Sequence, residues 1–300
     1  MRKKTFFTHN QSVTNSVNSK ILIFMFTMKN QLSAFFAFTL LLLALGFTAC
    51  QKEDANLNEQ AIITADNEGS GEDLFTDADD ISDMYAETYL GSGKTSDECP
   101  TVTSSAPAGT FPNTITIDFG TECVSEGGRV RSGQIIITVT DSMHNVGATR
   151  TKTFVDYFVN GIQIEGTYTV VNNGPDENGN PSFTHTLTGG AMTMPDGTTA
   201  TREATHTVTL IEGADTPGRW DNVLSVTGNS NGINKNGVAY SCVIIEPLIK
   251  RHNCRWIVSG VKEITRDGEV STLDFGDGDC NRFAILTTPD GETHEIRLPK

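Results

Sequence analysis

The strongest constraint on the fold of this chain is a regular alternation of apolar and polar residues that begins near Cys99. Residues 135–140 read Ile-Ile-Ile-Thr-Val-Thr, and similar runs lie on both sides of Asn160-Gly161. Alternation with a period of two is typical of β-strands that bury one face. An Asn-Gly pair between such runs predicts a hairpin, because a type I′ turn needs positive φ at both central positions. Strands joined by such tight turns pair antiparallel.

The same kind of turn signal recurs along the chain, at Asp196-Gly197, Asn236-Gly237, Asp267-Gly268 and Asp290-Gly291. Residues 99–300 are therefore the predicted antiparallel β domain, with about 12 strands and no helix after residue 98. That many strands rarely stay in one flat, open sheet, and their apolar faces must be buried against each other or around a common axis. The predicted fold class is all-β: an antiparallel meander of hairpins that forms a sandwich or a strongly curled, barrel-like sheet, preceded by a flexible acidic tether.

The cysteines predict two disulfides in this domain. Cys99 and Cys123 bracket one pair of expected strands, and Cys254 and Cys280 bracket another. Two cysteines outside the two ends of a hairpin meet across its open base, so we expect the bridges Cys99–Cys123 and Cys254–Cys280. Each bridge would contribute about 3.5 kcal/mol by chain entropy. Cys242 is left over, and we interpret it as a small buried apolar side chain within a strand.

An internal echo accompanies this pairing. The tetrapeptide Ile117-Asp118-Phe119-Gly120 precedes the second cysteine of the first pair, and Leu273-Asp274-Phe275-Gly276 precedes that of the second.

The chain begins with a segment that is typical of a secretory signal peptide. A basic region starts at Met28, an apolar region follows over 32–47, and small residues lead into Cys50. A lipoprotein signal peptidase reads this order, so residues 1–49 are the predicted signal peptide, with the true start at Met28, and Cys50 is the predicted lipidation site. Two alternatives stay open. Residues 1–27 could be genuine, or the apolar run could be a retained membrane span, which needs about 20 apolar residues.

Residues 50–98 are interpreted as a lipidated acidic tether. Asp, Glu, Asn, Ser and Gly dominate it, and few apolar residues are available to build a core. Apolar residues within 72–90 have rough helical spacing, with Asp77, Asp79 and Asp80 early in that segment. This pattern predicts a short acidic helix over 72–90 with carboxylates near its N-terminus.

Several of these features resemble a known group of proteins. Phe47-Thr48-Ala49-Cys50 resembles a lipobox, with Phe47 in place of the usual Leu, Val or Ile, and Gln51-Lys52-Glu53-Asp54 looks like the acidic export tag of Bacteroidota surface lipoproteins. The sequences Cys-Arg-Trp-Ile-Val-Ser-Gly from Cys254 and Asp-Phe-Gly-Asp-Gly-Asp-Cys up to Cys280 are similar to uncharacterised lipoproteins of that phylum. The resemblance implies an outer-membrane lipoprotein exposed at the cell surface. It implies no known activity.

Charge narrows the range of partners. The segment before Cys50 holds basic residues and no acidic ones, so its removal shifts the formal net charge from −15 to about −20. Such a surface repels phosphate backbones, which argues against nucleic-acid binding. The partners that we expect are the membrane, through the lipid at Cys50, and a polysaccharide or a protein.

Candidate chemical sites have weak sequence support. Gly91-Ser92-Gly93-Lys94-Thr95 looks like part of a phosphate loop, but the glycine that the motif needs is Thr88. The aspartates of 274–279 and the Asp176, Asn178, Asn180 run have oxygens for calcium, but neither matches the 12-residue calcium loop, and Asp and Asn are common in turns. No metal site or cofactor is predicted.

Two histidines form the remaining candidate pair. A two-residue turn at Asp196-Gly197 would place His206 opposite Leu187 and His185 opposite Val208, so that the histidines are diagonal neighbours on one face. Zinc would need a third ligand, which the spacing does not indicate. The alternation predicts that His206 and Val208 face inward, with Thr205, Thr207 and Thr209 on the solvent side.

The leading functional hypothesis is a non-enzymatic, lipid-anchored envelope protein that acts as a binding or structural module. None of the common nucleophile, zinc or phosphate-loop motifs occurs. The alternative is a glycan-active enzyme or a glycan-binding accessory protein. Catalytic carboxylates can be distant along the chain, and Trp220, Tyr240 and Trp256 could stack on sugars if they are exposed.

Overall fold

The structure, a computed structural model, describes residues 58–92, 99–125, 127–216 and 218–298. They form a helix over 58–92 and 14 strands in one sheet. The strands are β1 Thr101–Ser104, β2 Asn113–Asp118, β3 Cys123–Val124, β4 Val130–Val139, β5 Thr149–Val159, β6 Ile162–Pro175, β7 Pro181–Thr193, β8 Thr199–Glu212, β9 Val223–Ile233, β10 Ala239–Arg251, β11 Ile257–Arg266, β12 Glu269–Asp277, β13 Phe283–Thr287 and β14 Thr293–Arg297.

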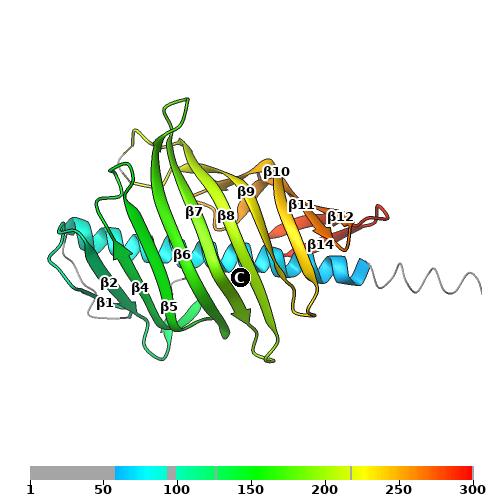
Figure 1. Ribbon diagram of the computed structural model, residues 1–300, viewed down its shortest axis with the longest axis horizontal. Helices are drawn as coiled ribbons and strands as arrows, with labels where there is room; N and C mark the ends of the chain where they lie inside the picture. The colour runs from blue at the N-terminus through cyan, green and yellow to red at the C-terminus, as the bar shows by residue number, and fades with distance from the viewer. Residues whose placement is uncertain (1–57, 93–98, 126, 217, 299–300) are drawn as a thin grey trace, which may run out of the picture. The chain divides into compact units, whose positions relative to one another are not determined.

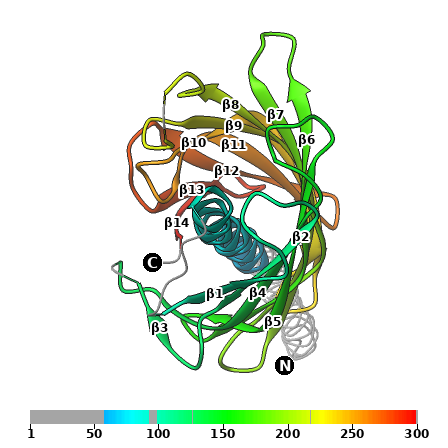
Figure 2. The ribbon, with the colours of Figure 1, turned by 90° about the vertical axis from the view of Figure 1, so that its left-hand side faces the viewer.

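The sheet is an antiparallel meander that curls around the helix. Its strands follow one another in chain order from β1 to β14, except that β3 lies off this path and pairs with β4. The strands cross the helix in Figure 1, and Figure 2 looks along the helix into the curl. The sheet is not closed into a barrel, because β1 and β14 are its two ends. The predicted fold class is confirmed, in its strongly curled form and with 14 strands where the sequence indicates about 12.

The predicted hairpin at Asn160-Gly161 is present. Asn160 has φ 50° and Gly161 has φ 82°, and together they join β5 to β6. Asp267 and Gly268, with φ 51° and 85°, join β11 to β12 in the same way. Positive φ at both central positions gives these turns the twist that matches the flanking strands.

Bulges at glycines bend the long strands. Register shifts interrupt the β4–β5 pairing beside Gly133 and the β6–β7 pairing beside Gly166. A Cβ on Gly133 would lie 1.9 Å from the carbonyl oxygen of Asp156, and one on Gly166 would lie 2.9 Å from Gly190 Cα. Bulges increase local twist and bend the strand, so these glycines allow the sheet to wrap around the helix.

The helix corrects the prediction of a tether. It covers 58–92 rather than 72–90, and it lies against the concave face of the sheet, where Leu74 and Phe75 are buried. Asp79, expected near a helix N-terminus, lies more than 20 residues into the helix. The low apolar content of this segment suggested that it could not join a core. The segment joins the core because its carboxylates form ion pairs with cationic side chains of the sheet. Residues 50–57 and 93–98 lie outside the described residues.

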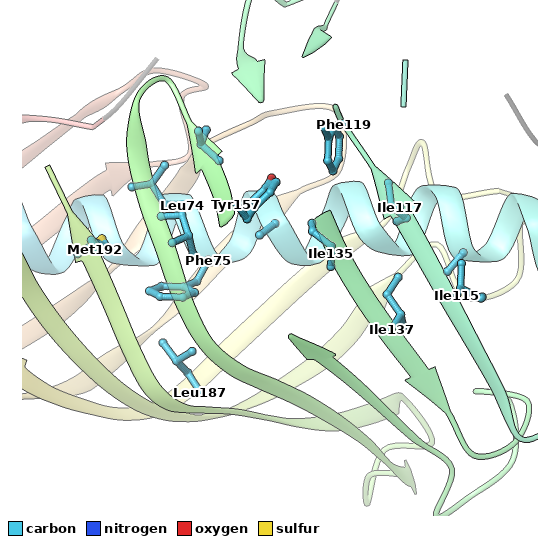
Figure 3. Close-up of a cluster of buried hydrophobic side chains, with 14 of the residues drawn as sticks. Leu74, Phe75, Ile115, Ile117, Phe119, Ile135, Ile137, Tyr157, Leu187 and Met192 are labelled. Carbon is cyan, nitrogen blue, oxygen red and sulfur yellow. The ribbon is translucent and has the colours of Figure 1, made fainter. Parts of the chain in front are cut away.

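Two hydrophobic clusters lie between the helix and the sheet. The first surrounds Leu74 and Phe75 and includes inward-facing residues of β1, β2 and β4 to β8, with Tyr157 fully buried (Figure 3). The second surrounds Ala61 and Ala65 and consists of residues from β10 to β14. The helix therefore forms part of both clusters.

Both predicted disulfides are present. Cys99 is bonded to Cys123 and Cys254 to Cys280, with Cα–Cα distances of 5.6 and 5.7 Å. Cys242 is a free thiol with 1% exposure within β10, as predicted, and burial raises its pKa to about 12.

The two similar tetrapeptides, 117–120 and 273–276, also have similar structures. Asp118 accepts a 2.8 Å hydrogen bond from the backbone N–H of Gly120, and Asp274 accepts one of the same length from Gly276. Both glycines have positive φ, and the phenylalanine of each tetrapeptide is buried. The two hairpins therefore end in the same local turn.

Candidate functional site

The helix and the sheet meet through three ionic clamps. In each clamp, two carboxylates four residues apart on the helix contact two cationic side chains of the sheet side. Such carboxylates lie on one face of a helix, one turn apart. The first clamp joins Glu68 and Glu72 to Arg202 and Lys262; the second joins Asp73 and Asp77 to Arg129 and Arg131; the third joins Asp79 and Asp83 to Arg150 and Lys152.

The first clamp is the most deeply buried. Lys262 Nζ lies 2.9 Å from Glu68 Oε1 and 2.8 Å from Glu72 Oε2, and the Lys262 and Glu68 side chains have no exposure. Arg202 contacts the same two carboxylates at 3.1 and 2.6 Å. The Tyr240 hydroxyl donates a 3.0 Å hydrogen bond to Glu68. Burial opposes ionisation of Glu68, but Arg202 and Lys262 outweigh it and hold the pKa of this carboxyl at about 2.

The second and third clamps differ in their balance of charge. Lys152 contacts both Asp79 and Asp83, and despite burial it holds the pKa of Asp79 below its ordinary value. In the second clamp, Arg129 Nη2 lies 2.9 Å from Asp73 Oδ2. Burial outweighs this contact and raises the pKa of Asp73 to about 6. Asp73 is therefore the clamp carboxyl whose charge is least well compensated among those with a resolved shift.

A cavity of about 130 Å³ lies beside these clamps, between the helix and the inner face of β6 to β12. One wall is helical and carries five carboxylates, and the opposite wall is mainly apolar. The helix wall contains Glu72, Asp73, Asp77, Asp79 and Asp80, and the apolar wall contains Val208, Leu224, Val226, Leu248, Ile257, Phe275 and Leu298.

Two histidines lie side by side in this cavity. His185 on β7 and His206 on β8 are direct cross-strand partners, and both line the cavity. His185 Nδ1 shares a 3.0 Å hydrogen bond with the Tyr168 hydroxyl and lies 3.6 Å from an Asp79 oxygen. Burial lowers the pKa of His185 below its ordinary value and that of His206 to about 4, so both rings are neutral at physiological pH.

This pairing corrects the predicted register. The turn at Asp196-Gly197 is longer than two residues, since Met194 N–H donates to Thr198 O, and Thr193 pairs with Thr199. A bulge after Leu187 shifts the register again, which brings the histidines directly opposite each other rather than diagonal. The prediction that His206 faces inward is confirmed, because its exposure is 5%.

The most exposed part of the cavity lining marks its mouth. Asp80, with 43% of its side chain exposed, is paired with Lys250. Arg255 is 31% exposed, and its guanidinium lies 5.7 Å from the centre of the Trp256 ring. A third histidine, His252, also lines the cavity and is exposed. Polar and charged side chains thus surround the entrance to an interior that is apolar on one side.

The other sequence candidates are not part of this site. Cys50 lies outside the described residues. Asp176 accepts hydrogen bonds from the backbone of Asn178 and Asn180, which is the chemistry of a turn. Gly91 and Ser92 are the last described residues of the helix, and the rest of the loop-like motif lies outside the described residues. Over the described ranges, no group of three or more His, Cys, Asp or Glu side chains is placed to hold a metal ion.

The three aromatic residues singled out from the sequence have different environments. Trp220 is 76% exposed in the β8–β9 connection, and Tyr240 is buried against Glu68. Trp256 is partly buried and lines the cavity. They do not form one surface for stacking on sugars.

Sequence reasoning missed the clamps. Their signal is present in the sequence as carboxylates four residues apart in the helix, matched by cations two residues apart at Arg129 and Arg131 and at Arg150 and Lys152. Within a strand, residues two apart share a face. Cations on an inward face therefore indicated that an acidic element would cover that face.

Comparison with known protein families, with curated proteins and with solved structures finds no match. Within the part of the chain that the structure describes, no helix is long and apolar enough to cross a membrane.

Proposed function

We propose that this protein is a lipid-anchored component of a bacterial cell envelope, and that its β domain is a non-enzymatic binding module exposed at the outer-membrane surface. The lipobox-like residues that end at Cys50 and the acidic residues after it support the anchor. The two disulfides fit the oxidising compartment that an exported domain enters.

The cavity is the observation that carries the binding function. It is a partly open space with an apolar wall and a few convergent polar groups, which is the usual composition of small-ligand sites. Glu72, Asp73, Asp77 and Asp79 belong to the clamps, Asp80 is paired with Lys250, and the histidines beside them are neutral at physiological pH. Fixed, neutral polar groups in an apolar space are suited to holding a molecule rather than to transferring protons.

A glycan-active enzyme or glycan-binding accessory protein is the second candidate, and Asp73 is the observation that favours it. A carboxyl group with a pKa of about 6 in a cavity is typical of a general acid. However, Arg129 holds this carboxyl, and the cavity is close in volume to one of about 150 Å³ that binds benzene. Hydrolysis of chromogenic glycosides that Asp73→Asn abolishes would favour the enzyme instead.

The anchor is tested by replacing Cys50 with Ala in the full chain expressed in a bacterium that lipidates exported proteins. Labelling with a palmitate analogue should be lost, and the protein should move from the membrane fraction to the soluble fraction. A matched Cys242→Ala variant should retain both label and location. Retention of label by Cys50→Ala would refute the anchor at this residue.

The binding function is tested with the intrinsic fluorescence of Trp256. The sequence has two tryptophans, so Trp220→Phe leaves Trp256, which lines the cavity, as the only one. Benzyl alcohol should change its emission saturably. Val226→Phe, which fills space in the apolar wall, should abolish this change while the protein remains folded by circular dichroism. Absence of any saturable change with benzene-sized molecules would contradict the binding function.

A further inference from the structure

The ion pairs between the helix and the sheet side include one cation that has no carboxylate of its own. The three clamps are balanced, because they hold six carboxylates and six lysine or arginine cations. Outside the clamps, the ion pairs of the helix add two carboxylates, Asp80 and Glu87, and three cations, Lys250, Arg219 and Arg255. Lys250 is paired with Asp80 and Arg219 with Glu87. Among the described residues in these ion pairs, Arg255 is therefore the cation left over.

The carboxylate nearest to Arg255 already has a closer partner. Arg255 Nη2 lies 3.8 Å from Asp73 Oδ2, which is too long for a hydrogen bond, whereas Arg129 Nη2 lies 2.9 Å from the same oxygen. A guanidinium carries five N–H donors in a planar fork that matches the two oxygens of a carboxylate. Within the described ranges, the Arg255 side chain donates no hydrogen bond to another residue, so its fork is free to bind a ligand.

Arg255 can be reached both from the cavity and from solvent. It lines the cavity at the mouth, and 31% of its side chain is exposed. Its guanidinium lies over the Trp256 ring, 5.7 Å from the ring centre, and Trp256 also lines the cavity. Stacking on an aromatic face is a favourable contact that restrains the orientation of a guanidinium. The cation is thus placed where the polar entrance meets the apolar interior.

The charges around Arg255 favour a ligand with one negative charge. The second clamp has two carboxylates, Asp73 and Asp77, and two arginines, Arg129 and Arg131, so that with Arg255 the group has a net charge of +1. A monoanion neutralises this group. An amine would add to its positive charge, and a dianion would bring one charge that has no partner, which is costly in a partly buried site.

The rest of the ligand meets an apolar wall. Val208 on β8 is the cross-strand partner of Val226 on β9, which is in turn the partner of Leu248 on β10, and all three line the cavity. The cavity volume of about 130 Å³ is close to that of a cavity of about 150 Å³ that binds benzene. An apolar body of this size therefore fits the interior while its charged group stays at the mouth.

We infer that the cavity binds a small carboxylic acid in its singly charged carboxylate form, with an apolar body of about benzene size, and that the Arg255 guanidinium binds the carboxylate at the mouth. The inference rests on the proposed binding function and specifies the ligand class of that site. Arg255 is the residue that selects an acid over an alcohol or an amine of the same size.

The test compares four probes with one aromatic ring at neutral pH: benzoate, benzyl alcohol, benzylamine and phenyl phosphate. Each is titrated into the Trp220→Phe protein, and binding is read from Trp256 emission. Benzoate should bind about 10-fold more tightly than benzyl alcohol, which corresponds to one charge-assisted contact at a partly exposed site. Benzylamine and phenyl phosphate, which is largely a dianion at this pH, should bind more weakly than benzoate.

The outcomes separate the ligand class from the binding function. Benzoate binding that is no tighter than that of benzyl alcohol would overturn the inferred ligand class while leaving a binding cavity. Tighter binding of benzylamine or phenyl phosphate than of benzoate would do the same. Failure of all four probes to bind would instead refute the proposed binding function, and the inference with it.

The role of Arg255 is tested by Arg255→Gln, with Arg251→Gln as the matched control. Arg251 is the last residue of β10; it is exposed and does not line the cavity, so its replacement removes the same charge from a nearby position outside the site. Arg255→Gln should lower the affinity for benzoate about 10-fold and leave that for benzyl alcohol unchanged, while Arg251→Gln should retain the preference. Loss of the preference in both variants, or in neither, would refute the role of Arg255.

Nitrogen NMR of the unmodified protein provides the same test if Arg255→Gln does not fold. The Nε signal of Arg255 should shift with benzoate and not with benzyl alcohol. An unchanged signal at saturating benzoate would refute the contact.

Discussion

The two halves of the helix meet the same sheet with different chemistry. The first half, over 58–72, turns small residues toward the sheet, namely Ala61, Ala65, Gly69 and Gly71. The second half, over 73–92, contributes Leu74, Phe75, Ala78 and Ala86 to the larger hydrophobic cluster. Each half nevertheless contains a clamp in which one buried lysine bridges two carboxylates. The same arrangement of one lysine between two carboxylates thus occurs where the helix buries few large apolar side chains and where it buries several.

This difference shows how an acidic segment becomes part of a core. Like charges four residues apart destabilise an isolated helix, and this helix has three such pairs within the clamps. Its second half gains burial of Leu74 and Phe75, whereas its first half has little apolar surface to bury. The first half therefore depends on Lys262 and Arg202, and the second half on packing as well as charge.

Removal of each bridging lysine is the sharpest way to break this comparison. Lys262→Met should cost about 3–5 kcal/mol, because it leaves Glu68 and Glu72 with one cation fewer in a fully buried site. Lys152→Met removes the equivalent lysine of the third clamp and should cost a similar amount in urea unfolding. Amide exchange should separate them: residues 58–70 should lose protection in Lys262→Met, while 74–86 should stay protected in Lys152→Met. Equal local exchange in both variants would contradict the different roles of packing.

Acid should weaken the first clamp over a defined range of pH. The folded-state pKa of Glu68 is about 2, below its ordinary 4.5, so its contribution of about 3 kcal/mol is complete above pH 4.5 and is lost as the pH falls through 2. The lowered pKa of His206, about 4 against 6.5, also removes stability below pH 6.5, and the raised pKa of Asp73, about 6, opposes this loss. We expect the steepest loss below pH 4.5.

Urea unfolding at a series of pH values measures this dependence. Glu68→Gln should be less stable than the unmodified protein at pH 7 and should show a shallower loss between pH 4.5 and 2. An unchanged slope in this variant would mean that Glu68 is not the group responsible.

Gly71 tests the close approach of the first half of the helix, with a smaller effect. A Cβ at this position would lie 2.9 Å from Arg202 Cδ and 3.2 Å from Met192 Cε. Overpacking costs about 1–3 kcal/mol, and the higher helix propensity of Ala returns about 1 kcal/mol, so Gly71→Ala should be destabilising by about 1 kcal/mol. Gly91→Ala meets nothing within 4 Å and should be neutral or slightly stabilising in thermal unfolding. A stabilising Gly71→Ala would contradict the close approach.

The sheet could be predicted from the sequence because its signals are local. Asn160-Gly161 has the turn geometry that its residue types require, and Cys254 and Cys280 join across a hairpin base as their spacing indicated. The register at His185 and His206 could not be predicted in the same way, because it depends on a longer turn and on a bulge between Leu187 and Gly190. Bulges leave only a weak signature in composition.

The candidate site was harder to predict because it is made by tertiary contacts. Glu68 belongs to a segment whose composition is that of a solvated chain, and its partners Arg202 and Lys262 are far away in the sequence. The cavity beside His206 exists only because the helix and β8 enclose it. The alternation of residues along the strand indicated that His206 faces inward. It did not indicate which residues of the helix lie opposite it.

The helix is the first described part of the chain to be made, but its contacts with the sheet can be completed only after the last strands have been made. The helix is synthesised before every strand, yet Glu68 meets Lys262 across a separation of 194 residues, while Asp73 meets Arg129 across 56. Contacts at such separations form slowly, because the closure of a long loop must come first. Until the later strands exist, repulsion between neighbouring carboxylates opposes early helix formation. A chain built in this way stays open while it is being synthesised and becomes compact only after its last third has been made.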